Sequence, residues 1–74
     1  MLEFKLDHTE CIELNNLLKV TRLCSSGGMA NTVIADGQVK VDGNTELRKR
    51  CKIRAGQVVE FGKQLITVKA SGTP

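Results

Sequence analysis

The sequence predicts an α+β domain in which two N-terminal helices pack on a small antiparallel sheet. Apolar residues recur at helical spacing from Cys11 to Ile34, and after Gly37 the hydrophobic period changes to two. Turn signals then divide the second half of the chain into strand-length segments. A chain of 74 residues is long enough for one domain only, which we place at residues 1–70, with residues 71–74 as a disordered tail.

The first half of the chain is expected to begin with a short strand. Apolar and charged side chains alternate over residues 2–6, which is the period of a strand. An amphipathic helix is expected over residues 9–19, because the leucines of this segment recur at helical spacing. Either Asp7 or Thr9 would serve as its N-cap.

A second helix is expected to begin at Ser25 or Ser26, since serine is a favoured N-cap residue. Its apolar residues from Met29 to Ile34 fall on a single stripe. Gly37 follows at the point where helices commonly end on a left-handed residue.

Short strands follow the second helix. Alternating or β-branched runs predict strands at residues 38–41, 51–53, 58–61 and 65–68. Turns are expected at residues 42–44, 55–56 and 62–63, each of which contains a glycine.

The composition excludes several classes of protein. Hydrophobic residues make up 41% of the chain and charged residues 26%, as in a folded globular domain. No apolar run approaches the roughly 20 residues of a transmembrane helix, and the charged N-terminus is unlike a secretion signal. We therefore expect a cytoplasmic protein with no membrane partner.

The cysteines argue against disulfide and metal chemistry. Cys11, Cys24 and Cys51 are odd in number and widely spaced, which indicates reduced thiols packed as small apolar side chains. His8 and Cys11 have the spacing of metal ligands, but no second close pair accompanies them. Cys51 would be reactive if it were exposed among bases, although a core-facing position is the better interpretation. We expect no metal, no cofactor and no catalytic residue.

Positive charge is concentrated in one segment. Residues 1–37 carry three bases and five acids, a net charge of −2, whereas residues 38–74 carry eight bases and three acids, a net charge of +5. Phosphate contacts would explain such a cluster, because guanidinium and ammonium groups both bind phosphate oxygens; a solvated turn is the alternative. Five of the eight bases form what we call the basic block: Arg48, Lys49, Arg50, Lys52 and Arg54.

Four further residues are candidates for nucleic-acid contacts. Ser26 either opens a helix whose free N–H groups receive a phosphate or is an ordinary cap. Lys19 and Arg22 either extend a binding surface or stabilise a helix C-terminus. Lys40 is a weaker candidate of the same kind. The chain has two Phe and no Tyr or Trp, which favours recognition of RNA backbone and shape over stacking of single-stranded bases.

Two residue patterns in the second half resemble a known family. The first is Ile34-x-x-Gly37-x-Val39-x-Val41-Asp42-Gly43, followed by Ile53-x-x-Gly56, and the second is Arg48-Lys49-Arg50-Cys51-Lys52. Together they resemble the RNA-binding domain first described in ribosomal small-subunit protein S-four, the αL motif, and within it the stand-alone bacterial YbcJ-like branch. The resemblance covers roughly residues 10–69.

This resemblance implies an αL-type RNA-binding fold in which two helices and the following loop contact structured RNA. It also implies that Ser26 lies where the family has a Ser-Arg pair; Gly27 replaces that arginine, so one usual phosphate contact is missing. We expect a non-catalytic, monomeric RNA-binding protein whose ligand is ribosomal RNA or a ribosome assembly intermediate. The alternative is a protein-interaction module that docks an acidic partner surface.

Overall fold

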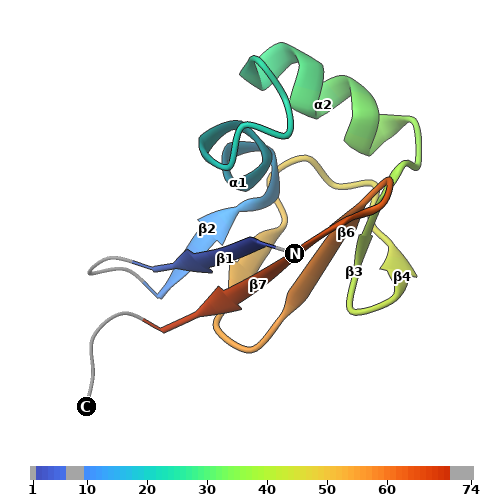
Figure 1. Cartoon of the computed structure of the whole chain (residues 1–74). Coiled ribbons are helices and arrows are strands. Elements are labelled where there is room, and N and C mark those ends of the chain that lie inside the picture. Colours follow the sequence, from blue (N-terminus) through green and yellow to red (C-terminus); the bar gives the residue numbers. More distant parts are fainter. Residues whose placement is uncertain (1, 7–9, 71–74) are drawn as a thin grey trace.

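Two short helices lie above one end of a five-stranded sheet in the computed structural model, which describes residues 2–6 and 10–70 (Figure 1). The predicted α+β class is confirmed, and the strand expected over residues 2–6 is present, but a second, unexpected strand also precedes the two helices. The elements in chain order are β1 (Leu2–Lys5), β2 (Cys11–Glu13), α1 (Leu14–Val20), α2 (Gly27–Ala35), β3 (Val39–Val41), β4 (Asn44–Thr45), β5 (Lys52–Arg54), β6 (Val58–Phe61) and β7 (Gln64–Lys69).

The five-stranded sheet is mixed, with the strand order β1-β7-β6-β3-β4. The expected all-antiparallel sheet is wrong at one edge, because β1 and β7 pair in parallel, with Leu2 opposite Ile66 and Phe4 opposite Val68. A parallel pair needs a long crossover connection, and the chain between β1 and β7 supplies it. The pairing packs Leu2 and Phe4 against a core that already contains Ile66 and Val68.

Helix α1 begins at Leu14 rather than at residue 9. The segment Cys11–Glu13 forms β2 instead and pairs antiparallel with β5 in a separate two-stranded sheet. Glu13 is extended, with φ −67° and ψ 142°, and occupies the N-cap position without a side-chain cap. Pairing with a strand distant in the sequence thus replaces the expected first helical turn. The proposed N-caps Asp7 and Thr9 lie outside the described residues.

Helix α2 has the ends that its capping residues predict. The Ser26 hydroxyl accepts a hydrogen bond from the Met29 N–H at 3.1 Å. Gly37, at φ +81°, follows the last turn, and the N–H groups of Gly37 and Gln38 donate to carbonyls of that turn in a Schellman motif. Met29 is 43% exposed, so the buried stripe of this helix consists of Ala30, Val33 and Ile34 and does not include Met29.

The strands after α2 lie within one or two residues of their predicted positions. Asp42 and Gly43 form the tight turn between β3 and β4, with φ values of 51° and 85°. Positive φ at both central residues is the conformation that favours a two-residue hairpin. The short strand β4 itself is not predicted by the local pattern.

The core lies between the helices, the inner face of the five-stranded sheet and β5. Cys24 is buried, as expected, whereas Cys11 and Cys51 are only half-buried. The buried apolar residues are Leu6, Leu14, Leu17, Leu18, Cys24, Ala30, Val33, Ile34, Val39, Val41, Ile53, Val59, Ile66 and Val68.

Candidate nucleic-acid interface

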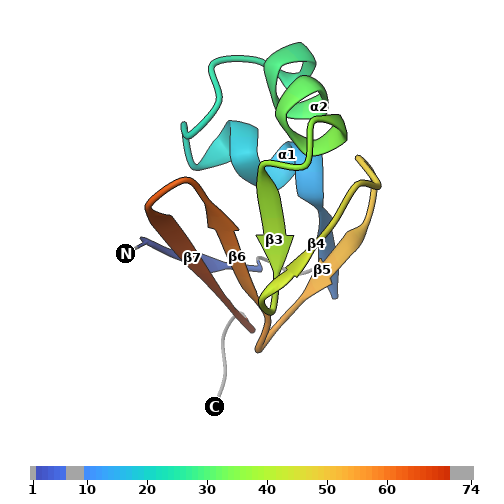
Figure 2. The same ribbon diagram turned by 90° about the vertical axis from the view of Figure 1, so that its right-hand side faces the viewer.

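The basic block begins in the connection from β4 to β5, which rises from the sheet to the helices (Figure 2). Two backbone hydrogen bonds fasten it to α1. The Leu14 N–H donates to the Cys51 carbonyl at 2.8 Å, and the Asn15 N–H donates to the Lys49 carbonyl at 3.0 Å. N–H groups of a first helical turn have no partner within the helix. The block therefore supplies part of the capping that α1 lacks, and its backbone is fixed relative to that helix.

The second half of the block lies on β5. Ile53 is fully buried, whereas Lys52 and Arg54 on either side of it are exposed. Successive side chains of a strand point to opposite faces, so Lys52 and Arg54 share the outer face, as the sequence predicted. Burial of Ile53 thus fixes two cations at the surface.

Two carboxylates hold the arginines at the start of the block. Arg48 donates to Glu46 from Nε at 2.9 Å and from Nη2 at 3.2 Å. Arg50 Nε donates to Glu13 at 3.1 Å. Both arginine side chains stay largely exposed, at 78% and 80%. The Glu13 side chain is 40% exposed, so its pair with Arg50 contributes little to stability. The Glu46 side chain is only 17% exposed, so its pair with Arg48 is better shielded from solvent. Both guanidinium groups nevertheless remain accessible to a competing anion.

Glu46, Arg48 and Cys51 form a small cluster. Side-chain and backbone hydrogen bonds from Arg48 lower the pKa of Glu46 to about 2. Burial raises the pKa of the Cys51 thiol, and the charge of Glu46 raises it further, although Arg48 Nη2 lies 3.8 Å from Sγ. Cys51 is therefore a neutral thiol at ordinary pH rather than the reactive thiolate that full exposure among bases would produce.

The other three bases of the block, Lys49, Lys52 and Arg54, form no ion pair with a described residue. Because they are also exposed, their charges are available to a partner. A depression of about 480 Å³ lies at the centre of the block and is lined by Arg48, Arg50, Cys51 and Lys52.

The block also borders both helices. One depression of about 350 Å³ places Lys49 beside the outer face of α2 and is lined by Asn31, Thr32, Ala35, Asp36 and Lys49. Another of about 190 Å³ lies at the starts of the two helices and is lined by Glu13, Asn15, Asn16, Lys19 and Gly27. The hydrogen bonds of Asn15 with Lys49 and Asn31 and the pair of Glu13 with Arg50 connect the block to both depressions. Together they form one surface of cations and amides that also contains the carboxylates of Glu13 and Asp36.

Two of the candidates outside the block belong to this surface. Lys19 shares its depression with Glu13, the partner of Arg50. Ser26 precedes Gly27 of the same depression, and its hydroxyl oxygen accepts the capping hydrogen bond from the Met29 N–H. The hydroxyl proton is not used by the cap, so an anion at this point could accept from it as well as from the backbone N–H groups of the helix start.

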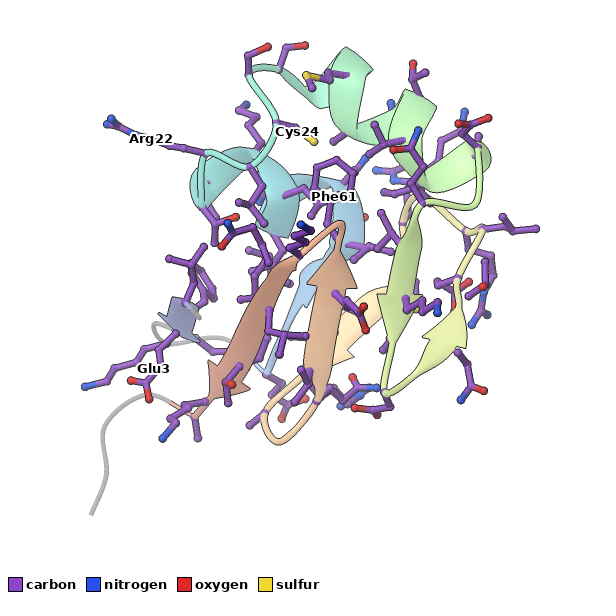
Figure 3. The ribbon with its side chains drawn as sticks, turned by 45° about the vertical axis from the view of Figure 1, so that its right-hand side comes forward. Glu3, Arg22, Cys24 and Phe61 are labelled. Atoms are coloured by element: carbon purple, nitrogen blue, oxygen red, sulfur yellow. The ribbon has the colours of Figure 1, made fainter. Side chains whose placement is uncertain are left out.

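The other two candidates lie elsewhere. Arg22 points outward from the connection between the helices, far from the connection between β4 and β5 (Figure 3). Lys40 alternates with the buried Val39 and Val41 and lies opposite Glu60, on the face of the sheet turned away from the core. The structure therefore does not bring Arg22 or Lys40 to the basic block.

Several residues of this surface were not predicted from the sequence. Glu46 lies two residues before Arg48, so the local spacing carried a signal for that pair. No sequence pattern indicates the pair of Glu13 and Arg50, because only the contact between β2 and β5 brings these residues together. The same holds for Asn15, whose Nδ2 donates to Asn31 Oδ1 across the two helices at 2.9 Å.

Comparison with known proteins identifies the fold. The S4 domain family model matches residues 4–69. The chain belongs to the S4 domain family. A relative from Escherichia coli (strain K12), named "Putative RNA-binding protein YbcJ", is 49% identical over 70 residues, which cover 95% of this chain and 100% of that protein. "Uncharacterized protein YbcJ" of Shigella flexneri has the same identity and coverage.

A solved structure agrees. The solution structure of YbcJ from E. coli, described as revealing an αL motif involved in RNA-binding, matches with a TM-score of 0.74 at 48% identity, covering 95% of this chain and 89% of that one. The resemblance to the αL family and its YbcJ-like branch is thereby confirmed. Neither relative's name denotes an enzyme.

Residues 2–6 and 10–70 contain neither a membrane-spanning helix nor a cluster of metal ligands. No helix there is long and apolar enough to cross a membrane. Nor do three or more His, Cys, Asp or Glu side chains gather there in a group that could hold a metal ion. His8 lies outside this part of the chain.

Proposed function

We propose that this S4 domain binds structured RNA, without catalysis, through the basic block and the starts of its two helices. The position of Lys49 carries the proposal. Its carbonyl accepts the Asn15 N–H, while its exposed ammonium group borders α2 and forms no ion pair with a described residue. A fixed backbone that presents an available charge suits a phosphate-binding loop. The RNA-binding name of the E. coli relative supports the same function.

The binding force is electrostatic. Five bases within seven residues repel one another, and an anionic ligand relieves that repulsion. Arginine forks bind phosphate oxygens in pairs, and lysines add point charges. With roughly four to six phosphate contacts, the logarithm of the binding constant falls with the logarithm of salt at a slope of about −3 to −5.

The ligand is structured rather than single-stranded RNA. Proteins that bind single strands stack the bases on aromatic side chains. Here both aromatic residues, Phe4 and Phe61, pack against the core. By analogy with the ribosomal member of the family, the ligand is ribosomal RNA or a ribosome assembly intermediate, bound by a cytoplasmic monomer.

The test is RNA binding by the wild type and by the triple variant Arg48→Ala/Lys49→Ala/Arg50→Ala, titrated with a structured ribosomal RNA fragment across a salt series. A matched control removes three positive charges elsewhere, with Lys5→Ala/Lys63→Ala/Lys69→Ala. Circular dichroism verifies that all three proteins are folded.

We expect the triple variant to bind more weakly, with a salt slope shallower by roughly 2 to 3, and the control to resemble the wild type. Equal losses in both variants would assign the binding to net charge rather than to the block. If the folded wild type binds no RNA even at low salt, the proposal fails. An acidic protein partner for the block would then be the function to examine.

A further inference from the structure

An amide pair joins the two helices beside the basic block. Asn15 Nδ2 on α1 donates to Asn31 Oδ1 on α2 at 2.9 Å, and both side chains are half-buried. An asparagine side chain has two N–H donors and one acceptor oxygen. Within residues 2–6 and 10–70, no hydrogen bond engages the Asn15 oxygen or the Asn31 amino group. The pair therefore keeps one acceptor and one donor group for a ligand.

A lysine lies on either side of this pair. Asn31 borders the depression of Lys49 on α2, and Asn15 borders the depression of Lys19 at the helix starts. The hydrogen bond from the Asn15 N–H to the Lys49 carbonyl keeps the block next to the pair. The surface therefore runs from a cation across a neutral amide pair to a second cation.

Each depression also contains one carboxylate, and each carboxylate has a donor. Glu13 accepts from Arg50 Nε at 3.1 Å, and Asp36 accepts from Gln38 Nε2 at 2.7 Å. The charge of Arg50 partly offsets that of Glu13, which lowers its repulsion of an anionic ligand, whereas Gln38 is neutral and leaves the charge of Asp36 in place.

A nucleic-acid backbone has the matching order of groups, since an uncharged sugar lies between two phosphates. The 2′-hydroxyl of ribose both donates and accepts hydrogen bonds, whereas deoxyribose lacks it. It complements the free oxygen of Asn15 and the free amino group of Asn31. A base is a poorer match, because the side chains that line these two depressions include no aromatic ring on which it would stack.

We propose that Asn15 and Asn31 form a ribose-reading site, flanked by Lys19 and Lys49, that makes this domain prefer RNA to DNA. The inference rests on the proposed function and extends it from phosphate binding to discrimination between the two nucleic acids. The amide pair contributes selectivity, and the basic block contributes most of the affinity.

The experiment compares one stem-loop in three chemistries: RNA, DNA and 2′-O-methyl RNA. The methylated form lacks the hydroxyl donor, so it separates reading of the hydroxyl from reading of helix shape. Binding is measured for the wild type, for Asn31→Ala and for the control Asn44→Ala, which removes an exposed asparagine on β4. If Asn31→Ala does not fold, Asn31→Asp replaces it, because it keeps the acceptor for Asn15 but loses the amino group. Its added negative charge weakens binding of all three ligands alike, so for this variant only the ratio of RNA to DNA binding is compared.

We expect the wild type to prefer RNA to both other ligands, and Asn31→Ala to reduce that preference about three- to tenfold without changing the salt slope. Asn44→Ala should keep the wild-type preference. Equal binding of RNA and DNA by the wild type, or an equal loss for all three ligands in Asn31→Ala, overturns the ribose-reading site but leaves RNA binding intact. Absence of binding to every ligand overturns the proposed function as well.

Discussion

The Asn15 N–H donates to the Lys49 carbonyl at 3.0 Å, which joins the first turn of α1 to the middle of the basic block. The bond is made by backbone atoms and does not depend on the lysine side chain. Position and charge are therefore separable at Lys49, because a substitution removes the cation and leaves the hydrogen bond. Phosphate binding and helix capping can then be tested independently.

Lys49→Ala should weaken RNA binding without destabilising the fold. The free energy of unfolding should stay within about 0.5 kcal/mol of wild type, as for other exposed side chains. Affinity should fall for every RNA tested, and the salt slope should become shallower by about 1. Urea denaturation and a salt series of binding titrations measure the two effects. A large loss of stability would show instead that the side chain contributes to the fold.

Gly37→Ala should destabilise the domain, because Gly37 adopts φ +81° at the end of α2. A residue with a Cβ in this conformation costs roughly 1–2 kcal/mol. The control is Gly27→Ala in the first turn of the same helix, where an added Cβ meets no atom within 4 Å. That control should leave stability unchanged or raise it by up to about 1 kcal/mol. Urea denaturation of both variants checks the difference, and equal effects would contradict it.

Local signals explain why α2 and the turn after β3 were predictable. Ser26 and Gly37 determine the helix ends through bonds within a few residues of each, and Asp42-Gly43 favours its tight turn by its own backbone preferences. None of these needs information from distant parts of the chain.

Local signals could not show that the helix expected over residues 9–19 begins only at Leu14. Cys11–Glu13 fits a helical pattern, and only its pairing with Lys52–Arg54 makes it a strand. The parallel pair of β1 with β7 likewise depends on the two ends of the chain meeting. The concentration of bases in the sequence predicted the basic block. Its contacts with Glu13 and Asn15 depend on the pairing of β2 with β5 and could not be predicted.

Glu46→Gln should lower the free energy of unfolding near neutral pH and make that free energy less dependent on pH in the acid range. Hydrogen bonds from Arg48 hold the pKa of Glu46 at about 2 in the folded state, below the ordinary value of 4.5. As the pH falls, the unfolded state therefore binds the proton first, and the stabilisation is lost between about pH 4.5 and pH 2.

Wild type should thus be more stable than Glu46→Gln near pH 7, and the two should converge as the pH approaches about 2. Urea denaturation at several pH values follows the difference. A difference that stays constant down to the lowest pH would show that the ion pair between Glu46 and Arg48 does not form in solution.

Glu13→Gln should strengthen RNA binding, because it releases Arg50 from its carboxylate partner and removes a negative charge from the depression of Lys19. Exposed ion pairs are worth up to about 1 kcal/mol, so affinity should rise by up to about fivefold, most clearly at low salt. The matched control is Glu3→Gln. Glu3 pairs with Lys69 Nζ at 3.3 Å on the β1–β7 edge of the sheet, away from the block (Figure 3). Binding titrations that gave the same increase for both variants would assign the effect to net charge, and no increase for Glu13→Gln would show that Glu13 does not compete with RNA for Arg50.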